Sequence, residues 1–307
     1  MLLANSVVMV EPRDFGFNSD TAVDNAFQHH SDLGKAGTTK AALTEFWRMV
    51  ETLDKHHVEV VALDSPIDVE VPDAVFPNNW FSTTSDALIV YPMKAPNRQL
   101  EVQTEQLSNV LEAKGFAIKE VHDLTDPSKI GGILEGTGVL IFDHKNQEIY
   151  ANISERCELD ALNWFGDTFG INTWPMYATT SVTVPVYHTN VLMACGNDFV
   201  VIAESCLTNN PVNVQAMERL RSTKEDVVTI SEEQMVESFC GNILQLQNSR
   251  NQPVIAMSEA ARKGFTPGQI KQLEKHGIII PCAIDTIEYV GGGSARCMLA
   301  EIFLQKA

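Results

Sequence analysis

The feature that most constrains the fold of this 307-residue chain is a repeat of about 55 residues. Each unit places a polar residue ahead of an apolar strand, followed by a turn and a returning strand. The stretches with this pattern are NNWFSTTSDALIVYP (78–92), EGTGVLIFDHKNQEIYANIS (135–154), HTNVLMACGNDFVVIAES (188–205) and GNILQLQNSRNQPVIAMS (241–258). A repeated unit of this length buries its apolar face against its neighbours. We therefore predict one domain over residues 1–307, because no linker interrupts the series.

A helix and a third strand are expected after most of these hairpins. The predicted helices span 97–114, 155–169 and 258–276, the last broken near Gly264 and Pro267. Glycines follow them at Gly115, Gly170 and Gly277, where a left-handed residue commonly ends a helix. The third strands are predicted at 116–121, 171–176 and 277–282, whereas the pattern after Cys206 is poorer.

The polar residues that begin the units are Asn79, Glu135, Asn190, Asn242 and Cys297, with spacings of 56, 55, 52 and 55 residues. Only about ten residues follow Cys297, too few for a complete last unit. The N-terminal strand SVVMVEP (6–12) is expected to complete it, which would also remove exposed sheet edges. A ring of five such units points its five leading residues toward the centre.

Composition excludes several classes of protein. A net charge of −18 disfavours nucleic acid and anionic membranes as partners, because both attract clustered Lys and Arg. No apolar run approaches the ~20 residues of a membrane helix, and MLLANSVVMVEPRD lacks the basic region of a signal peptide. The six cysteines include no CxxC pair. We expect them to be reduced, in a cytoplasmic protein.

Cys297 is the candidate nucleophile and lies in VGGGSARCM (290–298). The glycines allow close backbone approach, and the charge of Arg296 favours the thiolate. Ser294 is a suitable N-cap, and a helix beginning there would lower the pKa of Cys297 further. The repeat instead predicts a strand after Cys297, and the sequence leaves both possibilities open.

His188 and Glu135 are the candidate proton-transfer residues. His188 lies at a predicted strand start in VPVYHTNVLM, and a cysteine nucleophile requires a nearby base. Glu135 lies among glycines and aliphatic residues in GGILEGTGVL. Such a setting makes an unpaired carboxylate costly and raises its pKa, which suits it to proton transfer.

Further polar residues are candidates for substrate binding. Asn78 and Asn79 lie in VFPNNWF, and Asn190 follows His188 by two positions; for Asn78 an ordinary turn role is equally expected. Arg98 and Arg156 are candidate clamps because a guanidinium fork binds a carboxylate with two hydrogen bonds. Asp14 is a further candidate clamp, and a surface position remains the alternative for all three.

Three motifs in this order resemble the guanidine-modifying (pentein) superfamily: GGxxEGxG before a strand, HxN at a strand start, and GGGxxRCM near the C-terminus. Its members include arginine deiminases, dimethylarginine hydrolases and amidinotransferases. The chain most resembles the citrulline-utilisation hydrolases and arginine dihydrolases of this superfamily. The resemblance implies an α/β fold, a five-bladed α/β propeller with pseudo-fivefold repeats. It also implies that Cys297 is the nucleophile, His188 the general acid/base and Glu135 its partner, with no metal or organic cofactor.

The resemblance also bears on the substrate. Deiminases carry Asp in the loop matching FPNNW and two residues after the His, whereas this chain has Asn79 and Asn190. Dihydrolases carry Asn in the first loop. We therefore expect cysteine-dependent hydrolysis of a small guanidino or ureido compound: arginine, citrulline or both, giving ornithine, ammonia and carbon dioxide.

Other activities and a homo-oligomeric state stay open. An amidinotransferase or deiminase would use the same scaffold. A non-catalytic propeller, like a ribosome-binding factor, would not need Cys, His and Glu at equivalent positions. A papain-like protease is disfavoured because its Cys precedes its His.

Overall fold

The computed structural model describes residues 3–23 and 25–307, which form an α/β fold with five three-stranded sheets. In every sheet the middle strand is antiparallel to one neighbour and parallel to the other. The sheets, each listed in spatial order, are β15 (Ala300–Ile302), β1 (Ser6–Val10) and β2 (Glu59–Leu63); β3 (Phe81–Thr83), β4 (Ala87–Val90) and β5 (Glu120–Asp123); β6 (Ile141–Asp143), β7 (Glu148–Asn152) and β8 (Asn172–Met176); β9 (Met193–Cys195), β10 (Phe199–Ile202) and β11 (Asp226–Thr229); and β12 (Leu244–Gln247), β13 (Pro253–Ser258) and β14 (Ile278–Cys282).

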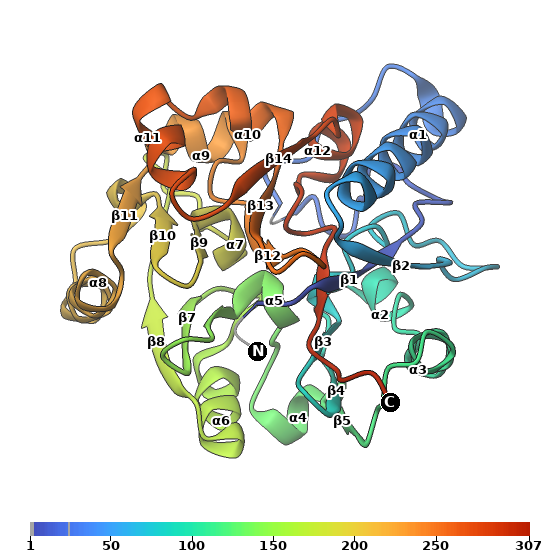
Figure 1. Ribbon diagram of the computed structural model, residues 1–307, viewed down its shortest axis with the longest axis horizontal. Helices are drawn as coiled ribbons and strands as arrows, with labels where there is room; N and C mark the ends of the chain where they lie inside the picture. Colours follow the sequence, from blue (N-terminus) through green and yellow to red (C-terminus); the bar gives the residue numbers. More distant parts are fainter. Residues whose placement is uncertain (1–2, 24) are drawn as a thin grey trace.

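Helices connect the parallel strands, because a parallel connection must cross from one end of the sheet to the other. The connecting helices are α1 (Gly34–Lys55), α2 (Pro96–Gln99), α3 (Thr104–Ala113), α6 (Leu159–Phe169), α8 (Pro211–Thr223), α10 (Glu259–Gly264) and α11 (Pro267–Leu273). Five shorter elements join one sheet to the next: the 3-10 helix η1 (Pro77–Asn79), α4 (Pro127–Ile130), α5 (Gly136–Val139), α7 (Thr189–Leu192) and α9 (Glu232–Ser238). The 3-10 helix η2 (Glu204–Cys206) and α12 (Asp285–Gly291) complete the described elements. Figure 1 shows the sheets around the middle of the molecule, with α1, α3, α6, α8 and α11 on the outside.

The predicted hairpins are all present, and the first and last strands of the chain pair as expected. Ser6 lies opposite Ile302 and Val8 opposite Ala300 in an antiparallel ladder. Strands β1, β4, β7 and β10 are buried along their whole length. Strands covered on both faces are typically continuous apolar runs. This explains why the hairpins were readable in the sequence.

Several predicted boundaries are corrected by the structure. The helix predicted at 97–114 is two helices, α2 and α3, and the helix predicted at 155–169 begins only at Leu159. The strand predicted at 116–121 begins later, at Glu120. The break near Gly264 and Pro267 is confirmed, with a capping box at Thr266.

The poorer sequence pattern after Cys206 still corresponds to a full helix, α8. Asn210 caps its first turn and Pro211 occupies the first position, a common start for a helix. Val212 and Val214 are exposed on α8. These apolar residues on the solvent side obscure the helical period in the sequence.

The glycines after the predicted helices behave differently from one another. Gly115 and Gly170 have left-handed backbones, as predicted. Gly277 is not among the positive-φ residues; a Cβ there would lie 3.0 Å from the carbonyl oxygen of Pro253. Close approach of backbone in the β13–β14 pair therefore accounts for this glycine.

No helix among the described residues is long and apolar enough to span a membrane. The six cysteines are unpaired, and five of them are buried, Cys195 being partly exposed.

Candidate active site

One cavity collects most of the predicted site residues. Its walls include Cys297, His188, Asn79, Arg98 and Arg156. The remaining lining residues are Thr21, Asn25, Asp73, Phe76, Tyr187, Gly291, Gly292 and Gly293. The sequence therefore predicted five of the residues in the cavity, and these come from four different units of the repeat.

Three of the predicted site residues are positioned by short helical turns and not directly by strands. Asn79 ends the 3-10 helix η1, while Glu135 and His188 precede the first turns of α5 and α7. The expectation that His188 lies at a strand start is therefore wrong, because the four residues of α7 separate it from β9.

Cys297 lies in a turn before β15 and not in a helix, which decides between the two possibilities left open by the sequence. Its backbone N–H donates to the carbonyl oxygen of Ser294 at 3.0 Å. Its Sγ accepts hydrogen bonds from Nδ2 of Asn190 at 3.3 Å and Nδ2 of Asn242 at 3.2 Å. Asn242 also receives the backbone N–H groups of Arg296 and Cys297 on its Oδ1, so its orientation is fixed.

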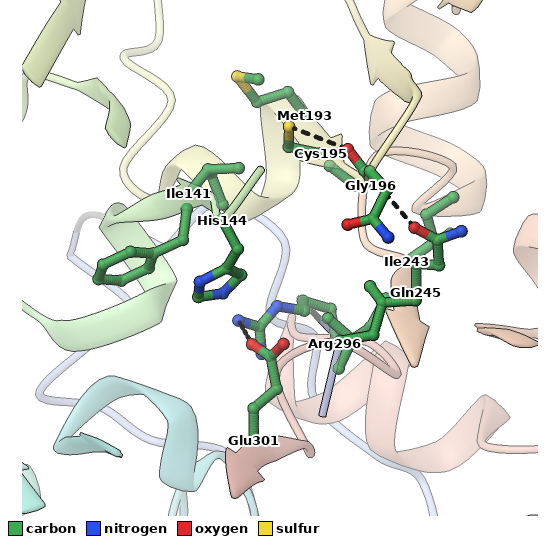
Figure 2. A pocket seen from close by; sticks show the side chains of 14 residues that line it. Ile141, His144, Met193, Cys195, Gly196, Ile243, Gln245, Arg296 and Glu301 are labelled. Atoms are coloured by element: carbon green, nitrogen blue, oxygen red, sulfur yellow. Dashed lines mark hydrogen bonds and ion pairs between the residues drawn. The ribbon is translucent and has the colours of Figure 1, made fainter. Parts of the chain in front are cut away.

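The expectation of a lowered Cys297 pKa is wrong. Burial raises the pKa of the Cys297 thiol, and this outweighs the opposing effects of the Ser294 backbone, Asn242, Arg296 and Asn190. Arg296 donates to the carbonyl oxygen of Leu299 and pairs with Glu301. Figure 2 shows this guanidinium beside Glu301 in a separate pocket that His144 also lines. Cys297 is therefore a neutral thiol near neutral pH.

His188 is held by a buried carboxylate. Its Nε2 lies 2.7 Å from Oε2 of Glu135, and both side chains are almost fully buried. Burial lowers the pKa of His188 despite Glu135. A neutral ring that donates from Nε2 to an ionised carboxylate keeps Nδ1 as its proton acceptor. His188 is therefore suited to the role of a general base.

Glu135 is ionised, contrary to the expectation of a raised pKa. Burial alone would raise its pKa, but Arg156 and His188 lower it well below its ordinary value. Nη1 of Arg156 donates to both Glu135 oxygens at 3.1 Å. Glu135 does not line the cavity. Its connection to the cavity is the hydrogen bond to the ring of His188.

Asn79 is bound by the second predicted arginine. Nη1 of Arg98 donates to Oδ1 of Asn79 at 2.8 Å, and Arg98 forms an ion pair with Glu101 at 2.9 Å. Nδ2 of Asn79 has no hydrogen-bond partner among the described residues. Arg98 and Arg156 are thus buried groups of the site and not surface charges.

Asn78 and Asp14 do not reach this cavity. Asn78 is fully buried outside the lining, and its carbonyl oxygen accepts from Thr137. Asp14 pairs with Lys35 at 2.8 Å and accepts from the backbone N–H of Val71.

Asn190 contacts Cys297 through Nδ2, while its Oδ1 has no partner among the described residues.

Asn242 and Asp73 are site residues that were not predicted from the sequence. Asn242 occupies one of the five leading positions, so the repeat contained the signal. Asp73 lines the cavity and is bound by Asn18 and Thr21 through Oδ2, while its Oδ1 has no partner in the part of the chain that the structure describes. Burial raises the pKa of Asp73 against the opposing effect of Arg98. An acidic residue in the apolar stretch VPDAVF was the available signal.

Within residues 3–23 and 25–307 no group of three or more His, Cys, Asp or Glu side chains is placed to hold a metal ion. The site around Cys297 contains one thiol, one imidazole held by a carboxylate, and amides with unused donors and acceptors. These groups are suited to covalent attack on a planar carbon, followed by proton transfer to and from nitrogen and water.

Comparisons with known proteins agree with this chemistry. The family model for N,N dimethylarginine dimethylhydrolase, eukaryotic, matches residues 11–304. No curated protein matches the sequence.

The solved structures with the same fold include ArgZ and DDAH. Apo ArgZ, a cyanobacterial arginine dihydrolase of the ornithine-ammonia cycle, superposes with a TM-score of 0.74 at 16% identity. The match covers 98% of this chain and 41% of ArgZ, so this chain spans less than half the length of that protein. A cysteine-to-serine variant of the ArgZ N-terminal domain, bound to substrate, gives 0.70 at 16% identity over 96% and 97% of the two chains. A cysteine-to-serine variant of DDAH from Pseudomonas aeruginosa, complexed with citrulline, gives 0.66 at 15% identity over 98% and 100%.

Proposed function

This chain belongs to the eukaryotic N,N dimethylarginine dimethylhydrolase family, a family of hydrolases of guanidino groups, and we propose that it hydrolyses the C–N bonds of arginine, citrulline or both through Cys297. The products would be ornithine, ammonia and carbon dioxide. One observation carries this proposal: Cys297, His188 and Asn79 line one cavity, and Glu135 orients His188.

In the first half of the reaction Sγ of Cys297 bonds to the central carbon of the guanidino or ureido group. The thiol proton passes to His188, which delivers it to the departing nitrogen, and the C–N bond breaks to release ammonia. In the second half His188 removes a proton from water, the water oxygen bonds to the same carbon, and the C–S bond breaks. Arginine passes through this cycle twice, with citrulline between the two rounds, and citrulline passes through it once. The round on citrulline leaves a carbamic acid on the side-chain nitrogen of ornithine. Loss of carbon dioxide then breaks this last C–N bond, and the carbamic acid proton passes to the nitrogen, which gives ornithine.

The resting pair of Cys297 and His188 is neutral, because burial raises the pKa of the thiol and lowers the pKa of the imidazole. A cationic guanidinium beside the sulfur favours the thiolate by charge attraction. A neutral ureido group offers no such help and depends more on hydrogen bonds to its oxygen. The two substrates therefore place different demands on the same site.

The α-amino and α-carboxylate groups of the substrate need partners of opposite charge. Asp73 lines the cavity and its Oδ1 has no partner among the described residues, so this carboxyl group is suited to an ammonium. Arg156 and Arg98 both line the cavity and supply guanidinium donors for a carboxylate. We assign Asp73 to the α-ammonium and Arg156, with Arg98 as the alternative, to the α-carboxylate.

The fold supports the assignment of the chain to a pentein-type scaffold. We propose that the five sheets are the blades of a five-bladed propeller built by residues 1–307 as one domain. The supporting observations are the shared strand order of the sheets and the pairing of β1 with β15.

Hydrolysis of N,N-dimethylarginine is a second candidate because the family description names it. A product assay separates the candidates: purified protein is given arginine, citrulline, agmatine and methylated arginines, and ammonia, methylamines, ornithine and urea are measured. Ornithine and ammonia from arginine or citrulline support the proposal. Turnover of methylated arginines alone, with citrulline as the final product, would contradict it.

A further inference from the structure

The turn that carries Cys297 is bound by a buried carboxyl group outside the cavity. Oγ of Ser294 donates to Oε1 of Glu288, and the carbonyl oxygen of Ser294 accepts the backbone N–H of Cys297 at 3.0 Å. Ser294 is fully buried and Glu288 is 5% exposed, so water does not compete for the bond between them. Glu288 does not line the cavity, and Ser294 connects its side chain to the nucleophile.

The backbone of Ser294 acts on the sulfur directly. Burial raises the pKa of Cys297, and hydrogen bonding from the Ser294 backbone is the largest of the effects that lower it, ahead of Asn242. A backbone group favours a thiolate by donating its N–H to the sulfur. The placement of the Ser294 backbone relative to Sγ therefore affects how much thiolate the site forms.

Glu288 belongs to α12, which leads into the glycines before Cys297. Its backbone carbonyl oxygen accepts the N–H of Gly292 at 2.9 Å, and Gly292 has the left-handed backbone of a C-terminal cap. Glu288 thus binds this turn twice, by its backbone at Gly292 and by its side chain at Ser294. Figure 1 shows α12 beside α1, which it contacts. The carboxyl group is therefore carried by a packed helix and not by a loop.

The hydrogen-bond partners of the Glu288 carboxyl group are hydroxyl groups. Ser258 binds it in addition to Ser294, and the charged groups that act most on it, Asp285 and Glu45, are also acidic. Burial raises the pKa of Glu288 to about 7 against the effect of the two serines. A carboxyl group keeps an acceptor oxygen in both charge states, so it can hold Ser294 below and above this pKa.

We propose that Glu288 is a positioning residue for the nucleophile: by holding Ser294 it keeps the backbone of this turn directed at the sulfur of Cys297. Without this acceptor the turn relaxes, and the sulfur loses part of the hydrogen bonding that favours its ionised form. The resulting effect on turnover rests on the proposed function, whereas the effect on the thiol does not.

The ionisation of Cys297 measures this role without any substrate. In Glu288→Met and in Ser294→Ala the thiolate ultraviolet absorbance, taken as the difference from Cys297→Ser, should titrate at higher pH than in wild type. At a fixed pH below the pKa the amount of thiolate should fall roughly fivefold to tenfold, the size expected for one hydrogen bond. An unchanged titration in Ser294→Ala would overturn the proposal. This variant loses only a hydroxyl group, so it decides the question even if Glu288→Met does not fold.

A double-mutant cycle and a conservative variant test the route through Ser294. Glu288→Met in the Ser294→Ala background should change the amount of thiolate by less than about a further twofold. Glu288→Gln retains an acceptor oxygen for Ser294 and should recover most of the thiolate that Glu288→Met loses. Additive losses, or no recovery with Gln, would overturn the proposal.

Glu45 provides the matched control, because it binds the other end of the same helix. Its carboxyl oxygens accept the backbone N–H groups of Thr286 and Ile287 at 2.9 and 3.0 Å. Glu45→Met should lower the free energy of unfolding and leave the Cys297 titration in place. An equal displacement of the titration in Glu45→Met would show that any loosening of α12 has this effect, and would overturn the specific role of Glu288.

Steady-state kinetics connects this role to the proposed reaction. In Glu288→Met, kcat should fall on whichever of arginine and citrulline the wild type hydrolyses, by a factor similar to the loss of thiolate. The inhibition constant of ornithine should stay within about twofold, because no contact with a bound molecule is removed. Weaker ornithine binding with an unchanged kcat would overturn the proposal. A wild type that hydrolyses neither substrate would refute the proposed function, and the titration would still decide the role of Glu288.

Discussion

Arg98 and Arg156 occupy similar places in neighbouring units of the fold and support different chemistry. Each lies about twenty residues after the leading residue of its unit and donates to it: Arg98 to Asn79, 19 residues earlier, and Arg156 to Glu135, 21 residues earlier. The leading residue of one unit is a neutral amide, and that of the other is a carboxylate.

The difference lies in the source of the counter-charge. Arg156 is neutralised by the leading residue itself, and Glu135 in turn holds His188. Arg98 is neutralised by Glu101 from outside the cavity, which leaves position 79 free to be an amide. A buried guanidinium needs a carboxylate nearby in either case. Because Glu101 supplies this carboxylate, the site can carry Asn instead of an acid at position 79.

The largest expected effect is a difference in catalytic rate between variants of the two carboxylates, Glu135 and Glu101. Glu135→Gln should lower kcat by about 10²–10⁴-fold, because the amide no longer holds His188 in the charge state and orientation needed for proton transfer. Glu101→Gln should lower the arginine rate by less than about tenfold, since it touches no reacting group. Steady-state kinetics on both substrates provides the measurement, with Cys297→Ser as the inactive reference. Similar losses for the two variants would remove the distinction between the units.

The second prediction concerns stability. Arg156→Met and Arg98→Met should each lower the free energy of unfolding by roughly 3–5 kcal/mol, because each leaves a carboxylate buried without its partner. Removing Glu101 as well should restore most of the stability of the Arg98 variant. Removing Glu135 as well should restore stability to the Arg156 variant but leave it inactive. Urea unfolding followed by circular dichroism measures both, and a failure of either second substitution to rescue stability would contradict the charge argument.

The hairpins of the fold could be predicted because the sequence signals for strands and turns are local. Buried middle strands such as β4 and β10 are apolar runs, and the turn between each pair of strands is visible in the sequence. The spacing of the leading residues singled out Asn79 and Cys297, which line the cavity, and Glu135, which contacts His188. The short helices α5 and α7 have only four residues each and carry no periodic signal.

The charge states were not predictable, because they depend on partners that only the fold brings together. The pKa of Glu135 is lowered by Arg156, which no sequence pattern assigned to it. The pKa of Cys297 is raised by burial, although the neighbouring Arg296 indicated the opposite. That guanidinium is bound to Glu301 in the pocket of Figure 2. Adjacency in sequence was therefore a poor guide to electrostatic contact.

The third prediction concerns the variant Asn79→Asp, which places a carboxylate at the leading position of the unit that contains Arg98. Asn79→Asp places two acids around one guanidinium, and we expect a loss of about 1–3 kcal/mol in stability, which Glu101→Gln should restore. Citrulline hydrolysis should fall far more than attack on arginine in both variants, because a carboxylate meets the ureido oxygen with lone pairs on both sides. Product analysis from arginine and citrulline checks this. Citrulline hydrolysis at the wild-type rate in Asn79→Asp would contradict it.

The smallest expected effect concerns the amides that bind Cys297, which unlike Asn79 donate to sulfur. Asn242→Ala removes one donor to Sγ, and since such a bond favours the thiolate, the pKa of Cys297 should rise further above its ordinary value. At any pH below the pKa the variant therefore holds less thiolate than wild type, and its titration curve moves to higher pH. The measurement is the thiolate ultraviolet absorbance as a function of pH, taken as the difference from Cys297→Ser. Cys157→Ala is the matched control, because its buried thiol lies outside the cavity and should leave the Cys297 titration in place. A titration that moves to lower pH in Asn242→Ala would mean that the amide stabilises the neutral thiol, and would reverse the role assigned to Asn242.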